Sequence, residues 1–147
     1  MRKWNLPLTY EPKIQPVLNG TCKQTIRGTG KNNIRKQVGD LISFHGWAGR
    51  PYWSSWSSWR MPYTPLKEVI NITILEKGII GTFTSEDVGD TSEEYYVRCT
   101  LWLWSELDFL AAKDGILPPN GETLRNILIS KNGKIPKEGI KAQVLRW

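Results

Sequence analysis

Cysteine and histidine are scarce in this chain, and their scarcity excludes several kinds of protein. The 147 residues include two cysteines, Cys22 and Cys99, and a single histidine. Two distant cysteines do not build a disulfide framework, and with one histidine they lack the ligand spacing of a zinc site. We therefore expect no metal, no other cofactor and a reducing compartment.

Long apolar runs are also missing. No stretch approaches the about 20 apolar residues that a membrane-spanning helix requires. The opening MRKWNLPLTYEP lacks the apolar core of a secretory signal. Hydrophobic residues make up 39% and charged residues 23% of the chain, as in ordinary globular proteins. We expect one cytoplasmic domain over residues 1–147, without a membrane partner; the oligomeric state stays open.

Acidic residues are few in the first part of the chain. Residues 1–60 carry ten lysines and arginines against only Glu11 and Asp40, whereas residues 61–147 have a net charge of −2. Such asymmetry favours a polyanionic partner, most often nucleic acid, although a solvated basic surface produces the same pattern. The candidate phosphate contacts in the Gly/Asn-rich loop are Lys31, Arg35 and Lys36.

Tryptophan, by contrast, is abundant, with eight residues in the chain, three of them in the stretch PYWSSWSSWR. A period of three does not match the period of two of a strand, so we expect an irregular loop between prolines. The rings either cap the protein's own core or stack on bases, with the flanking arginines contacting phosphates. We predict a split, with at least one ring buried and one exposed. The candidate ligand contacts are Trp53, Trp56, Trp59 and Arg60.

Local patterns predict several strands and three short helices. Helices are expected over residues 11–20, 105–116 and 120–130, where capping residues and glycines bound helical spacing. Apolar, β-branched or alternating runs predict strands near residues 4–10, 21–27, 38–47, 66–83 and 139–147, the fourth of these as a hairpin. An acidic loop is expected over residues 85–94, and a further strand over 95–104. Strands that do not alternate regularly with helices indicate an α+β fold.

The most informative motif is GTCKQTIR, residues 20–27, which is followed by Gly39-Asp40 and a strand, then by KDGI at 113–116 and a closing KAQVLRW. In this order the motifs resemble the ASCH domain family of the PUA-like superfamily over nearly the whole chain. The resemblance implies a small PUA-like mixed β-barrel with flanking short helices and a cleft whose floor is the first motif. It also implies binding of RNA or modified nucleosides. Some members hydrolyse the acetyl amide of acetylcytidine, and ribonuclease activity is described for others.

The amidohydrolases of that family use a motif lysine, a motif threonine and a downstream acid. By resemblance, Thr25 falls on the threonine, Asp114 on the acid and Arg27 on the motif arginine. Cys22 falls on the lysine, which is the main departure from the family pattern. Lys23 is one residue away, and neighbouring side chains of an extended segment point to opposite faces. Cys22 itself is a candidate nucleophile if a nearby cation stabilises its thiolate, or a plain buried cysteine if not.

These observations lead to three hypotheses. The leading one is an RNA- or nucleoside-binding domain with a basic, tryptophan-lined cleft. The second is an enzyme, an acetylcytidine-type amidohydrolase or a ribonuclease-like protein, using Thr25, Asp114 and either Lys23 or Cys22 in the same cleft. A weaker third is a protein–protein adaptor with an adhesive tryptophan patch. An amine of Lys23 beside Thr25 and Asp114 would favour the enzyme, whereas an apolar Cys22 in that place would favour binding.

Overall fold

The computed structural model describes residues 1–88 and 99–147, which form a mixed α+β fold. Proline and glycine mark most of the boundaries between its elements. In chain order these elements are β1 (Lys3–Pro7), α1 (Glu11–Leu18), β2 (Gln24–Gly28), β3 (Leu41–Trp47), β4 (Trp56–Arg60), β5 (Thr64–Pro65), β6 (Glu68–Ile74), β7 (Gly78–Thr82), α2 (Ser85–Val88), β8 (Cys99–Leu103), the 3₁₀ turn η1 (Trp104–Glu106), α3 (Asp108–Lys113), α4 (Gly121–Asn132) and β9 (Ile140–Arg146).

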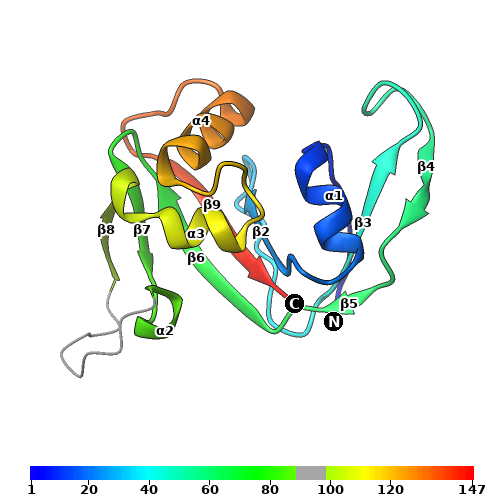
Figure 1. Cartoon of the computed structure of the whole chain (residues 1–147), viewed down its shortest axis with the longest axis horizontal. Helices are drawn as coiled ribbons and strands as arrows, with labels where there is room; N and C mark the ends of the chain where they lie inside the picture. The colour runs from blue at the N-terminus through cyan, green and yellow to red at the C-terminus, as the bar shows by residue number, and fades with distance from the viewer. Residues whose placement is uncertain (89–98) are drawn as a thin grey trace.

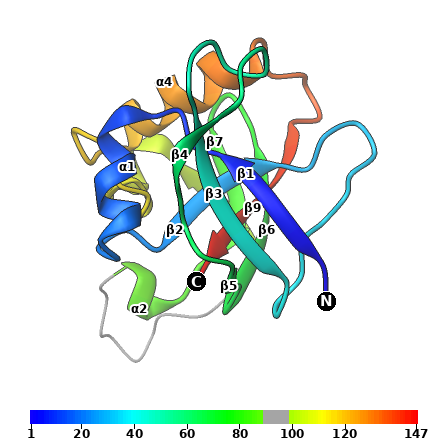
Figure 2. The same ribbon diagram turned by 90° about the vertical axis from the view of Figure 1, so that its right-hand side faces the viewer.

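The strands form two sheets (Figure 1). In the first, β3 pairs in parallel with β1 and antiparallel with β4 and β5. In the second, the order is β2-β9-β6-β7-β8, and all the neighbours are antiparallel. Figure 2 shows the two sheets one behind the other, with α1 beside them. The described strands do not join into one closed hydrogen-bonded barrel, so the finer PUA-like architecture remains a prediction.

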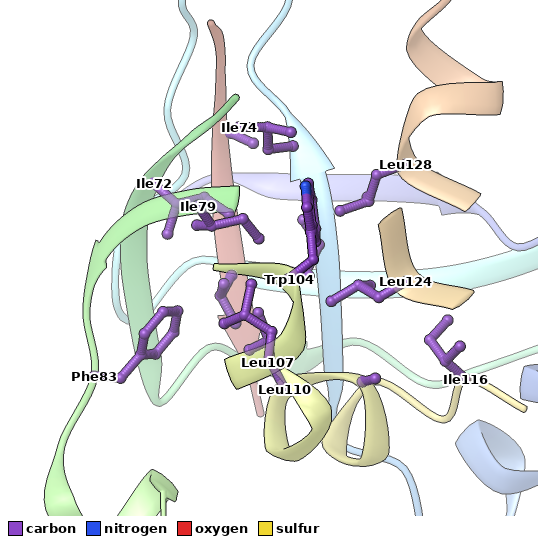
Figure 3. Packing of buried hydrophobic residues seen from close by; sticks show 14 of the residues in the cluster. Ile72, Ile74, Ile79, Phe83, Trp104, Leu107, Leu110, Ile116, Leu124 and Leu128 are labelled. Carbon is purple, nitrogen blue, oxygen red and sulfur yellow. The ribbon is translucent and has the colours of Figure 1, made fainter. Parts of the chain in front are cut away.

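The larger hydrophobic core lies between the second sheet and the helices α3 and α4, which cover one of its faces (Figure 1). Figure 3 shows how apolar side chains from the β6–β7 hairpin meet those of the two helices. The alternating β-branched residues of the hairpin and the helical spacing of the leucines both point into this layer. Its fully buried members include Ile79, Phe83, Leu107, Leu110 and Leu124.

A second core joins the two sheets to α1. Leu6 and Phe44 from the first sheet meet Val17 of α1 and Leu145 of β9. Trp147 closes it, with its ring centroid 5.2 Å from that of Phe44. Because this core includes the motif residue Cys22, it fixes the segment leading into β2 against both α1 and the start of the first sheet.

Most of the elements predicted from local patterns are present, and three predictions need comment. The hairpin near residues 66–83 and the helices at α1, α3 and α4 are confirmed. The irregular loop expected for the tryptophan stretch is wrong in part, because its second half is strand β4. The acidic loop expected at residues 85–94 begins with the short helix α2, and its remainder lies outside the described residues. The strand expected at 95–104 is described from Cys99 onward.

Candidate functional site

The motif segment enters the fold as β2, an edge strand that pairs with β9. Thr25 and Arg27 lie two residues apart, so their side chains share one face of the strand. The Nε of Arg27 donates a hydrogen bond to the Thr25 hydroxyl oxygen at 3.2 Å, and its Nη2 donates to the carbonyl oxygen of Pro7 at 2.8 Å. Burial lowers the pKa of the Arg27 guanidinium, an effect that the nearby Asp114 carboxylate partly offsets.

No carboxylate in the described part of the chain forms an ion pair with Arg27. Asp40, the acid of the Gly39-Asp40 motif, is therefore not an ion-pair partner of Arg27. Asp40 instead accepts hydrogen bonds from the backbone of Arg2 and Gln37 and from the indole of Trp4. A largely buried guanidinium without an acidic partner keeps its capacity to hold a phosphate or a carbonyl oxygen.

The predicted acid, Asp114, has a lysine beside it, but the lysine is one that the motif did not indicate. Lys13 of α1 places its Nζ 3.1 Å from Asp114 Oδ2, and both side chains are nearly buried, with 4% and 8% of their surface exposed. Gln24 donates from Nε2 to the other carboxylate oxygen, Asp114 Oδ1, at 3.4 Å. The ammonium group of Lys13 therefore lies beside the candidate acid Asp114, although position 22 of the motif is not a lysine.

Cys22 lies next to this ion pair as a small buried residue. Its sulfur contacts the carbonyl oxygens of Gln24 and Lys113, each at 3.6 Å. Burial raises the pKa of the Cys22 thiol, and the opposing effect of Lys13 is smaller. The thiol therefore stays protonated at neutral pH, which disfavours the thiolate mechanism.

Lys23 does not take the place of the missing motif lysine. Its side chain is exposed and lines a different pocket, together with Lys113 and Arg146. This is the geometry expected of consecutive residues in an extended segment, which face opposite ways. The amine of Lys23 therefore does not lie beside Thr25 and Asp114, as the enzyme hypothesis required. An apolar Cys22 lies near Asp114 instead, and Lys13 supplies an amine that the motif did not predict.

Thr25, Arg27, Lys13 and Asp114 together line one pocket, whose apolar wall is formed by α4 and the segment before α1. Its volume is about 20 Å³, which is room for roughly one water molecule. The polar side chains therefore lie close enough together to act on one small polar group. A nucleoside does not fit between them in this conformation.

The basic loop before β3 is divided between solvent and interior. Lys31 and Arg35 are exposed, as predicted for phosphate contacts. Lys36 is buried, with its Nζ 4.5 Å from the ring centroid of Trp4, and its backbone exchanges hydrogen bonds with the side chain of Gln143. Burial also lowers the pKa of the Lys36 ammonium. Lys36 is therefore a packing residue in this structure, and its burial disfavours the phosphate contact predicted for it.

The tryptophan stretch is split between exterior and interior by the strand geometry of β4. Trp56 and Trp59 are an odd number of positions apart, so they point to opposite faces of the strand. Trp59 packs against the second core, whereas Trp56 is 41% exposed and Trp53, in the preceding turn, 78% exposed. The predicted split is present in part: Trp53 and Trp56 are exposed, but Trp59 is half-buried and not fully buried, and the period of three produces the difference between Trp56 and Trp59.

The outer face of the first sheet carries aromatic rings with cations over them. Trp56 stacks on the buried ring of His45 with centroids 4.1 Å apart, and the Arg60 guanidinium lies 4.7 Å from the Trp56 centroid. Arg60 and Tyr63 both donate hydrogen bonds to Asn5 Oδ1, at 2.9 and 2.8 Å. We call this set, with Trp53 under Arg50 at 4.9 Å, the aromatic–cation face.

Lys13 is the functional candidate that the sequence analysis missed. In α1 the buried residues are Lys13 and Val17, whereas the apolar side chain of Leu18 is exposed. The available signal was the spacing of four between Lys13 and Val17, which puts both on one helix face. A lysine on a buried face needs an acidic partner, and the motif acid supplies one.

Within residues 1–88 and 99–147, no three His, Cys, Asp or Glu side chains gather in a way that could hold a metal ion. Among the described helices, none has the length and the hydropathy needed to cross a membrane. Comparisons of the chain with protein-family models, with curated proteins and with solved structures found no match.

Proposed function

We propose that this protein is an ASCH-type, PUA-like domain that binds single-stranded RNA or a nucleoside-like ligand. The observation that carries the proposal is the aromatic–cation face, where exposed rings alternate with arginines. Proteins that bind single strands combine aromatic or guanidinium planes, on which bases stack, with cations that contact the phosphates. The resemblance of the motifs to the ASCH family supports the same ligand class.

The arrangement of the face suits bases better than a protein partner. Arg60 is held in place by Asn5 and lies over both Trp56 and Tyr63, so its planar guanidinium is oriented before a ligand arrives. A base stacks on such a plane while the remaining N–H groups contact phosphate. The surrounding first part of the chain carries only two acids, which keeps the local field positive.

A fluorescence titration with single-stranded RNA tests the proposal. We expect quenching of tryptophan emission and an affinity that falls about tenfold between 50 and 200 mM salt, as counterion release at two phosphates requires. Arg60→Ala and Trp53→Ala should each weaken binding several-fold. Arg125→Ala is the matched control, because Arg125 is a surface arginine on α4 that forms an ion pair with Glu76 and lies outside the aromatic–cation face. An RNA affinity that does not change with salt or in either variant would contradict the proposal and favour the protein–protein adaptor.

A second candidate function is hydrolysis of an acyl amide on a modified base. The observation in its favour is the convergence of Lys13, Thr25 and Asp114 on one pocket. The Thr25 hydroxyl would attack the acyl carbon and pass its proton to Asp114, while the Lys13 ammonium would stabilise the oxyanion. The C–N bond would then break as Asp114 returns the proton to the departing amino nitrogen of the base, and water would hydrolyse the acyl-threonine ester to release the acid and free Thr25. Since the pocket holds about one water, α1 and α4 must separate before a substrate enters.

Hydrolysis of N4-acetylcytidine, followed by chromatography, tests this second function. Thr25→Val should abolish turnover while Thr25→Ser preserves it, because serine keeps the hydroxyl. Lys23→Met is the control, since Lys23 faces a different pocket. Turnover that persists in Thr25→Val, or a parent protein no faster than buffer, would exclude this chemistry.

A further inference from the structure

A second pocket is lined by the segment that leads into α1, by α1 itself and by residues of β3, β4 and the connection between these strands. We call it the Glu11 pocket. Its volume is about 240 Å³, and its apolar lining includes Leu8, Ile14 and Trp59. This volume is below the roughly 300–1,000 Å³ typical of drug-sized ligand sites, so the pocket suits a single flat ring system.

Glycine makes room for the aromatic wall. A Cβ on Gly46 would lie 2.7 Å from Trp59 Nε1 and 2.8 Å from Ser57 Oγ, so only glycine lets the indole of Trp59 lie against the backbone of β3. Because Trp59 faces the interior side of β4 while Trp56 faces outward, the wall of the Glu11 pocket and the aromatic–cation face meet along the same strand.

The polar groups of the pocket are of two kinds. Glu11 is the only charged residue among those that line it, and as a carboxylate it accepts hydrogen bonds but does not donate them. Among the described residues, the buried Nε1 of Trp47, which is also in the lining, has no hydrogen-bond partner, and neither has Ser57 Oγ, which lies behind Gly46 and outside the lining. Both atoms are covered from solvent, so the charged group that the pocket offers to a ligand is the exposed Glu11 carboxylate.

We infer that the Glu11 pocket takes one unstacked base that carries an exocyclic amino group, such as cytosine or adenine, in preference to uracil. This inference rests on the proposed function, and it names the base class and the place where it binds. The amino group donates to the Glu11 carboxylate, whereas the carbonyl oxygen of uracil at the same edge would face a second acceptor. The flanking arginines, Arg50 and Arg60, lie outside the pocket on the path of the phosphates.

Binding of the oligonucleotides rC₈, rA₈ and rU₈ to the full chain, measured by fluorescence anisotropy at constant salt, tests the inference. We expect rC₈ and rA₈ to bind at least about fivefold more tightly than rU₈, the discrimination that one base contact provides. Glu11→Gln should reduce this ratio to near one, because the glutamine amide donates to the uracil carbonyl as readily as it accepts from an amino group.

Glu122→Gln is the matched control, since Glu122 is likewise an exposed glutamate in the first turn of a helix, α4. It should leave the ratio unchanged. Equal binding of all three oligonucleotides, or a ratio that survives Glu11→Gln, would overturn the inference while the proposed function stands. Failure of all three to bind would overturn both.

Discussion

The Nζ of Lys13 lies 3.1 Å from Asp114 Oδ2, and this buried ion pair ties α1 to the residue that ends α3, 101 positions along the chain. Asp114→Asn removes the charge that compensates the Lys13 ammonium. We expect it to lower the free energy of unfolding by about 3–5 kcal/mol, because an unpaired buried charge is costly. Chemical denaturation measures the effect.

The double variant Lys13→Met with Asp114→Asn should recover most of that loss, since it leaves no charge unpaired. An Asp114→Asn protein as stable as the parent would show that the pair does not hold α1 in place. In that case the ion pair would not explain why Lys13, Thr25 and Asp114 line one pocket.

The lysine of the family motif can be put back to test whether Lys13 replaces it. Cys22→Lys places a second ammonium group in a buried site beside Lys13, whose carboxylate partner among the described residues is Asp114. We expect it to destabilise the fold by several kcal/mol, as unpaired buried charges do. Adding Lys13→Met should restore stability, because the new lysine then pairs with Asp114. If the double variant is no more stable than Cys22→Lys alone, the two positions do not serve one site.

Trp56 and Trp59 should respond oppositely to truncation. Trp59→Ala removes a ring that packs on the second core, and we expect a loss of about 3–5 kcal/mol in the free energy of unfolding. Trp56→Ala removes a 41% exposed ring and should cost much less, while RNA binding weakens. Thermal denaturation and the RNA titration, run on both variants, separate the two roles. Equal destabilisation would mean that both rings serve the fold alone.

The pH dependence of stability should reflect Asp87. Burial alone would raise the pKa of this carboxyl, but hydrogen bonds from Lys113 and the Thr84 backbone, together with the charge of Arg146, bring it below its ordinary value. A lowered folded-state pKa contributes stability above the unfolded pKa, and this contribution is lost as the pH falls through the folded pKa.

Asp87→Asn should therefore be less stable than the parent by about 1–3 kcal/mol at pH 7 and pH 5, with the gap closing below about pH 4. Denaturation at pH 7, 5 and 3 measures it. Glu86→Gln, at the exposed neighbouring position in α2, should show a small gap at every pH. A gap for Asp87→Asn that persists unchanged at pH 3 would show that its cause is not the carboxylate charge.

Local patterns in the sequence were enough to determine most of the elements. The β-branched runs around Lys77-Gly78 predicted the β6–β7 hairpin, and the alternation of KAQVLRW predicted β9. Both signals depend on the fixed period of side chains along a strand and on turn residues, which need no knowledge of distant neighbours. The same local logic placed the neighbours Cys22 and Lys23 on opposite sides of the motif segment, and in the structure Cys22 is buried while Lys23 is exposed.

Only the tertiary structure decided which residues meet at the site. Lys13, Thr25 and Asp114 come together because α1 packs beside β2 and the end of α3, and their contacts span up to 101 positions of the chain. Lys36 became a packing residue, although its neighbours Lys31 and Arg35 stayed in solvent, because the side chains of Trp4 and Gln143 meet it there. Sequence periodicity fixes the face of a helix or strand on which a side chain lies. The partner that packs against that face depends on how distant elements meet. The charge and burial of this partner then decide the role of the residue.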